Sequence, residues 1–190
     1  MKKLVLALCI LCGVAAQSQT EENLTYVLDT ERSLINWRGY YAFLFSDHKG
    51  TVNFKNGELR TAAGAIVGGS FVIDMNSISN SDYLEGNGPV EHLKDKDFFH
   101  VEKFPLAMLT IVSAEYFPEE NRHKFIGLLT IKGISKEQEF WGVANGDKLE
   151  LRTQFKIDRT RWGINYNNEL KDHAIAEAIE FDVYLKFKAL

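Results

Sequence analysis

The sequence predicts an all-β domain, built as an antiparallel sandwich or barrel, and two observations lead to this class. Apolar and polar residues alternate along most of the chain, which is typical of strands with one buried and one exposed face. The apolar runs are also short, and turn residues separate them at regular intervals. The alternation is clearest over Leu149–Asp158 and from Ile179 to Lys188. The pattern alone does not distinguish a sandwich from a barrel.

The remaining elements follow from the same two signals. Strands are expected, in chain order, over residues 26–29, 33–41, 50–55, 58–61, 65–75, 106–116, 124–132 and 137–143. The pair Asn56-Gly57 predicts a tight turn between two of these strands, and Lys132-Gly133 and Asn145-Gly146 predict two more. Helix is expected only as a short segment at about 90–94, inside a long connection, and as a single turn that begins at Asn168.

The N-terminal segment, residues 1–18, has the order of a secretory signal peptide. Two lysines precede an apolar run over residues 4–14, and small residues follow. Both cysteines, Cys9 and Cys12, fall inside this segment. The mature chain is therefore expected to have no disulfide and no cysteine metal site. We expect an exported protein, periplasmic or extracellular, in which residues 19–190 form a single domain.

The charge of the mature chain argues against two classes of partner. Removing Lys2 and Lys3 with the signal segment takes the formal net charge from −4 to −6. Nucleic acids and anionic membrane surfaces both attract clustered lysine and arginine, so an acidic chain is a poor candidate for either. The apolar run in the signal segment is too short to span a bilayer, and no other run is longer. We expect neither a nucleic-acid partner nor a transmembrane segment.

Four segments resemble known motifs and occur in a fixed order. Residues 26–33 read Tyr-Val-Leu-Asp-Thr-Glu-Arg-Ser, and residues 92–105 contain His-Leu, Asp-Phe-Phe and Lys-Phe-Pro. Residues 127–136 read Gly-Leu-Leu-Thr-Ile-Lys-Gly-Ile-Ser-Lys, and residues 157–164 read Ile-Asp-Arg-Thr-Arg-Trp-Gly-Ile. Together they resemble the YceI-like family over the whole mature chain. His100 departs from the pattern, because an acidic residue commonly follows the two phenylalanines in that family.

The resemblance implies an eight-stranded antiparallel lipocalin-like barrel with a short helical connection, in which an apolar cavity binds an isoprenoid or other long-chain lipid. It implies no cofactor beyond such a bound lipid. Closing a sheet removes its edges, and about eight strands leave room for packed side chains or one small ligand. The residues themselves leave open whether the interior is filled or hollow. The aromatic segment 40–45 could support a homodimer, although a barrel core would use the same residues.

A hollow barrel would be lined by the inward faces of its strands. We expect His92 and the pair Phe98-Phe99 to shape one end of the pocket. The other predicted ligand contacts share an apolar side chain on the expected inner face, and they are Ile35, Trp37, Phe54, Phe71, Ile73, Leu109, Ile111, Leu129, Phe155, Phe181 and Val183.

Histidine and carboxylate residues come close in sequence at His92, Asp95, Asp97 and His100. Such side chains could bind a metal ion, but the spacing matches no strong metal motif. The sequence also contains neither a Gly-x-Ser-x-Gly nor a His-Glu-x-x-His motif. We therefore expect no metal and no catalysis. The rival hypotheses are a lipid-metabolising isomerase or hydrolase that uses His92 and Asp97, and a side-chain-filled barrel that acts through its surface.

Asp158, Arg159 and Arg161 allow two interpretations. The guanidinium groups of Arg159 and Arg161 could bind an acidic head group, because arginine presents a planar fork of donors. The favoured interpretation is structural: Arg159 would pair with Asp158 or with a carboxylate on a neighbouring strand and would fix the closure of the barrel. Trp162, followed by Gly163, is expected to lie beneath a tight turn.

Overall fold

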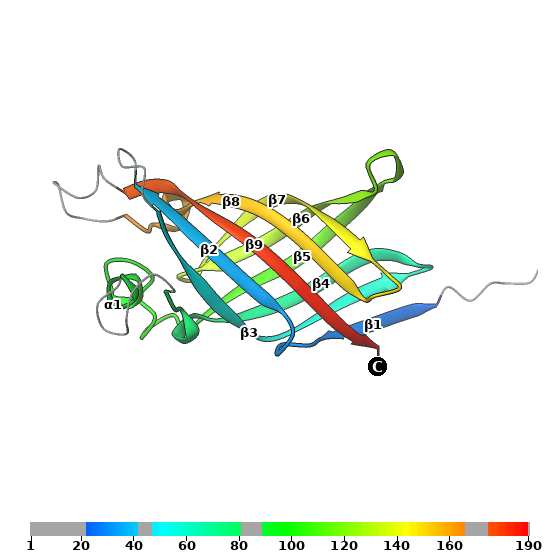
Figure 1. Cartoon of the computed structure of the whole chain (residues 1–190), viewed down its shortest axis with the longest axis horizontal. Coiled ribbons are helices and arrows are strands. Elements are labelled where there is room, and N and C mark those ends of the chain that lie inside the picture. The colour runs from blue at the N-terminus through cyan, green and yellow to red at the C-terminus, as the bar shows by residue number, and fades with distance from the viewer. Residues whose placement is uncertain (1–21, 42–46, 81–88, 166–174, 190) are drawn as a thin grey trace, which may run out of the picture.

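The computed structural model describes residues 22–41, 47–80, 89–165 and 175–189. The predicted signal segment, its two cysteines and the helical turn predicted at Asn168 lie outside these ranges. Within them the chain forms nine strands and a few short helical segments (Figure 1). The strands are β1 (Asn23–Leu28), β2 (Leu34–Tyr41), β3 (Asp47–Ala62), β4 (Ala65–Asp74), β5 (Leu106–Phe117), β6 (Arg122–Ile131), β7 (Ile134–Asn145), β8 (Glu150–Asp158) and β9 (Ile175–Ala189).

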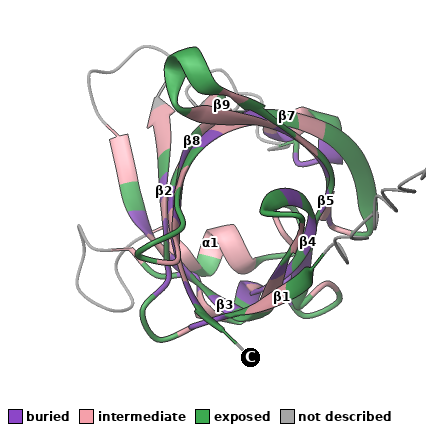
Figure 2. Ribbon diagram, turned by 90° about the vertical axis from the view of Figure 1, so that its right-hand side faces the viewer, coloured by how far each residue is buried: buried purple, intermediate pink, exposed green. Residues whose placement is uncertain are grey.

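All strand pairs are antiparallel, and the sheet closes on itself. Neighbours follow the order β3-β2-β9-β8-β7-β6-β5-β4, and the pairing of β3 with β4 closes the ring. The short strand β1 adds no ninth position, because it lies between β3 and β9 beyond the end of β2. Its residue Val27 opposes Glu58 and Lys188, whereas Ile35 of β2 opposes Val52 and Val183. The predicted eight-stranded antiparallel barrel is confirmed, and Figure 2 shows the closed ring nearly end on.

The C-terminal strand shows how the alternation of residues separates the inside of the barrel from its outside. In β9 the side chains of Ile179, Val183 and Leu185 are buried inside the barrel. The residues between them, among them Glu180 and Asp182, belong to the opposite face of the strand, as expected from the period of two. In this protein the sheet curls into a ring, and the closed ring covers the apolar face of every strand.

The turn predicted at Asn56-Gly57 is wrong. Both residues lie within the long strand β3, which runs without a break from Asp47 to Ala62. A register shift between Phe54 and Asn56 marks a bulge. Glycine occurs here because a Cβ at position 57 would lie 2.6 Å from Cδ1 of Phe71. The residue therefore makes room for a core side chain, and the chain does not change direction at this position.

The predicted short helix is confirmed as α1 (Val90–Lys94). The chain then returns through turns whose backbone bonds hold it against the helix: Phe99 N donates to Leu93 O at 3.1 Å, and Val101 N donates to Lys94 O at 3.0 Å. Phe98 and Val101 are buried. In Figure 2 α1 lies across the far opening of the ring, so this segment covers one end of the barrel.

Three further short segments are 3₁₀ helices, at Met75–Ser77, Pro118–Glu120 and Arg159–Trp162. The last of these ends as predicted. Trp162 is fully buried and its Nε1 donates to Leu129 O at 3.1 Å. Gly163 follows in the left-handed region with φ of 65°, a conformation that favours glycine. No helix in the described ranges is long and apolar enough to cross a membrane.

Candidate functional site

A cavity of about 500 Å³ lies inside the barrel. This volume falls in the range of about 300–1,000 Å³ that is usual for pockets that bind small ligands. A barrel completely filled by side chains, one of the rival hypotheses, is therefore wrong. The structure brings together at this cavity every residue that the sequence predicted as a ligand contact: Ile35, Trp37, Phe54, Phe71, Ile73, His92, Phe98, Leu109, Ile111, Leu129, Phe155, Phe181 and Val183. Contact with a ligand stays a prediction for each of them.

The end of the barrel near the C-terminus is filled. Leu28 and Phe187, which oppose each other on β1 and β9, are both buried, and so is Leu59 on β3. None of the three belongs to the cavity wall. The ring of Phe71 joins the two regions, because it lines the cavity and lies 6.4 Å from the ring of Phe187, centroid to centroid. The cavity therefore extends from this apolar plug towards the opposite end.

The opposite end is covered by α1 and the turn after it. Leu93, Phe98 and Phe99 all line the cavity from this segment. The rings of Phe98 and Phe99 meet edge to face at 5.0 Å, and the ring of His92 lies 6.0 Å from that of Phe98. The structure thus places His92 and the two phenylalanines together at one end of the cavity, as predicted.

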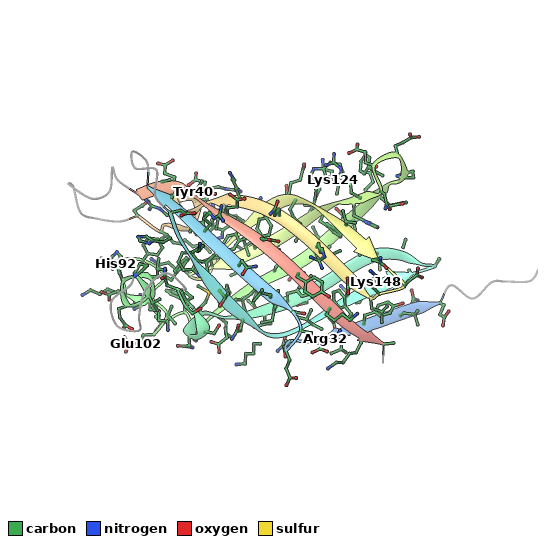
Figure 3. All side chains as sticks on the ribbon, viewed as in Figure 1. Arg32, Tyr40, His92, Glu102, Lys124 and Lys148 are labelled. Atoms are coloured by element: carbon green, nitrogen blue, oxygen red, sulfur yellow. The ribbon has the colours of Figure 1, made fainter. Side chains whose placement is uncertain are left out.

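Polar side chains gather at the same end. Tyr40, His48, His92 and Arg159 all contribute to the cavity wall. Figure 3 labels Tyr40 and His92, which lie at the end of the barrel that carries α1. His48 opposes Gly39 where β2 and β3 pair at this end, and Arg159 directly follows β8. The cavity is therefore apolar along most of its wall and polar at one end.

Sequence reasoning missed three of these polar residues as cavity residues. His48 continues the inward alternation of Val52 and Phe54, and extending that pattern to the start of the strand would have found it. Tyr40 falls where a register shift interrupts the pairing of β2 with β9, and such a shift changes which face a side chain occupies. For Arg159 the sequence allows a role as a head-group ligand but favours a structural role.

Arg159 has a structural role and also lines the cavity. The side chain is 2% exposed, and its Nη1 donates to Ile164 O at 2.5 Å while its Nε donates to Ala176 O at 3.3 Å. These bonds tie the turn after β8 to the start of β9. Asp158 instead accepts hydrogen bonds from the backbone N and the hydroxyl of Thr160, at 2.9 and 2.6 Å. The guanidinium group thus holds the turn after β8 against β9 and also places a positive charge on the cavity wall, and binding of a head group by Arg159 stays a prediction.

The proposed acid–base pair of the enzyme hypothesis is not assembled at the cavity. His92 lines the cavity, but Asp97 is exposed and forms no part of its wall. The carboxylate of Asp97 acts on Lys132 instead: burial lowers the pKa of that lysine, and Asp97 partly offsets the effect. Among the described residues, no three His, Cys, Asp or Glu side chains lie close enough together to share a metal ion.

Comparison with known proteins assigns the chain to a family. Residues 26–187 match the YceI-like domain. BcnA of Burkholderia cenocepacia has a similar structure, with a TM-score of 0.69 and 16% identity over 83% of this chain and 98% of BcnA. A polyisoprenoid binding domain of Saccharophagus degradans, implicated in plant cell wall breakdown, is also similar. Its TM-score is 0.60, with 15% identity over 88% of this chain and 99% of that domain. No curated protein sequence matches. The two structural likenesses show the fold, the domain match covers most of the chain, and the chain belongs to the YceI-like family.

Proposed function

We propose that this protein is a non-catalytic binding protein that holds one isoprenoid or other long-chain lipid in the barrel cavity. The observation that carries the proposal is a cavity of about 500 Å³ whose wall is mostly apolar, with its titratable side chains and Arg159 at one end. Such a wall offers few hydrogen bonds, so it favours guests whose main gain is the removal of apolar surface from water. The resemblance to a polyisoprenoid binding domain supports the same class of ligand.

The size of the cavity favours a long chain. If each chain carbon occupies about the 30 Å³ of a water molecule in the liquid, the cavity holds on the order of fifteen carbons. Burying each methylene group contributes about 0.8 kcal/mol, so a five-carbon chain gains only about 4 kcal/mol. Loss of translational and rotational freedom costs at least about that much. Only a chain several times longer leaves a useful surplus.

The distribution of polar groups sets the expected orientation of the ligand. Tyr40, His48, His92 and Arg159 lie at the α1 end, whereas Leu28 and Phe187 plug the other end. A polar head group at the α1 end would keep hydrogen-bond partners, and the tail would run towards the plug. Burial of the head group at the apolar end would leave its polar atoms unsatisfied, which costs about 1–3 kcal/mol for each group.

Binding without turnover is supported by the position of Asp97. An isomerase or hydrolase that used His92 and Asp97 would need both groups at the substrate, yet Asp97 is exposed and lies off the cavity wall. Export to the periplasm or the medium is part of the proposal and rests on the sequence of residues 1–18. A homodimer stays a prediction, because most of the aromatic segment 40–45 lies outside the described residues.

The test compares two tryptophan variants on one strand. Leu109 of β5 lines the cavity, and its neighbour Met108 is 45% exposed on the outer face. The protein would be expressed in a host with an unmodified lipid composition, and its mass would be measured by native mass spectrometry before and after solvent extraction. We expect a stoichiometric lipid in the wild type and in Met108→Trp. Leu109→Trp should lose most of it, because the indole occupies the space of the ligand.

Two outcomes would contradict the proposal. One is a wild-type mass that shows no lipid and stays unchanged after incubation with prenols, quinones and fatty acids. The other is equal lipid loading of Leu109→Trp and Met108→Trp. A lipid that is not displaced by a side chain filling the cavity must be bound elsewhere. Catalysis is tested separately: added lipid that is recovered chemically changed from the wild type, but not from His92→Ala, would favour the enzyme.

A further inference from the structure

Four phenylalanines form a continuous row across the inner face of four neighbouring strands. Phe125 of β6 opposes Phe140 of β7, and Phe155 of β8 opposes Phe181 of β9. The centroids of successive rings lie 5.2, 5.3 and 5.4 Å apart, with interplanar angles of 21°, 32° and 33°. Trp37 of β2 opposes Phe181 and continues the aromatic wall in the next strand. We call the four rings the phenylalanine row.

The geometry of the phenylalanine row decides which part of each ring meets the cavity. Side chains stand roughly perpendicular to a sheet, and each ring of the row is tilted by 21–33° from the next. At centroid distances of 5.2–5.4 Å the rings turn much of their faces towards one another, and we infer that they present mainly their edges to the cavity. Phe140, Phe155 and Phe181 all line the cavity. Phe125 is fully buried and ends the row against the ring of His123, which lies 5.7 Å away at 18°.

Ring edges and ring faces differ in charge. The face of a phenyl ring carries partial negative charge and its edge carries partial positive charge. A carbon–carbon double bond is electron-rich above and below its plane, so it is attracted to a row of ring edges. A saturated chain of the same shape gains only dispersion there. The wall formed by β4 and β5 is mostly aliphatic, with Ile73, Ala107 and Ile111, and its aromatic residue Phe71 is not part of the row.

We propose that the phenylalanine row determines specificity: it selects chains that contain double bonds over saturated chains with the same carbon skeleton. This inference rests on the proposed lipid-binding function and narrows it, because unsaturation rather than isoprenoid branching is the feature recognised. A saturated isoprenoid therefore binds less tightly than its unsaturated counterpart, although both fit the same cavity.

The test uses farnesol and hexahydrofarnesol, which share a branched skeleton and a hydroxyl head, differ in their double bonds and match the size of the cavity. Dissociation constants would be measured by titration of the delipidated protein. The wild type is expected to bind farnesol about 3- to 10-fold more tightly, the range of one or two aromatic contacts. In Phe155→Leu and in Phe181→Leu the ratio falls to within about twofold. Two separate positions keep the test decisive if one variant folds poorly.

A matched control distinguishes two causes of tighter binding, namely contact with the phenylalanine row and the stiffness of the unsaturated ligand. An unsaturated chain has fewer freely rotating bonds and loses less entropy on binding, in any variant. Phe54→Leu removes an equal ring from β3, which lines the cavity outside the row. Its ring stands 6.2 Å from that of Phe71 at 59° and belongs to no parallel stack. The wild-type ratio should persist in this variant.

The outcomes separate this inference from the function on which it rests. Tight binding of both alcohols with equal constants, or a wild-type ratio that persists in Phe155→Leu and Phe181→Leu, would overturn the role of the row and leave lipid binding intact. A ratio that falls equally in Phe54→Leu would also overturn it. No binding of either alcohol, in protein that also yields no lipid on extraction, would overturn both.

Discussion

Gly57 leaves space in the barrel wall that a core ring occupies. A Cβ at this position would lie 2.6 Å from Cδ1 of Phe71 and 3.1 Å from Cδ2 of Leu28, so the ring would have to shift. Overpacking of this kind typically costs about 1–3 kcal/mol, and we expect Gly57→Ala to lower the free energy of unfolding by that amount. Urea denaturation measures it. Gly146→Ala is the control, because nothing lies within 4 Å of its Cβ. Equal destabilisation by both substitutions would contradict this account.

The same glycine shows how far single residues can be interpreted from sequence. A turn signal depends on two adjacent residues, whereas the need for glycine at position 57 comes from Phe71 on a neighbouring strand. Inward-facing apolar residues were predicted well, because the period of two follows from local backbone geometry. Polar cavity residues such as His48 and Arg159 were harder to identify, because polar side chains on the inner face break the pattern used to recognise that face.

At the level of elements, β1 and β9 are joined by a buried carboxylate. Asp29 directly follows β1 and is 4% exposed, and its carboxylate lies 3.0 Å from Nζ of Lys188 on β9. The hydrogen bond from Lys188 lowers the pKa of Asp29 most, and the backbone N–H of Arg32 adds to it, while burial acts in the opposite direction. The ion pair thus favours the ionised carboxylate in the folded state.

We expect Asp29→Asn to lower the stability at neutral pH, with an effect that disappears in acid. A carboxyl group with a lowered pKa contributes its full stabilisation above the unfolded value of about 3.9, and loses it as the pH falls through the lower folded value. Because Lys188 is mostly exposed, solvent screening keeps the effect modest. Urea midpoints measured at pH 7, 5 and 3 test this. A deficit that is the same at all three pH values would contradict it.

The strands themselves were predictable, but their places in the barrel were not. Alternation is a local signal and located β8 and β9 within a few residues. That β1 and β2 occupy a single position between β3 and β9 depends on partners far away in the sequence. The long β3 was divided in two for the same reason, since its continuity is set by successive pairing with β2, β1 and β4.

For the whole molecule, the sequence left open whether the barrel is filled or hollow, and the structure combines both. Leu28 and Phe187 plug one end, while Ile35 and Phe181 line a cavity towards the other. All four are apolar residues on the inner face, so composition and period cannot separate them. The difference depends on how many side chains converge at each level of the ring, which only the assembled barrel determines.

A half-filled barrel should be stabilised as a whole by its ligand, because a lipid held in the cavity binds the folded state and not the unfolded chain. At a free ligand concentration of about 100 times Kd the gain is about 2.7 kcal/mol. For a domain of this size that raises Tm by about 5–10 °C. Calorimetry of delipidated protein with added farnesol measures the shift. It should persist in Met108→Trp and shrink in Leu109→Trp, since only the latter side chain enters the cavity. If Tm stays independent of lipid concentration in protein first shown to be lipid-free, the cavity does not bind this lipid.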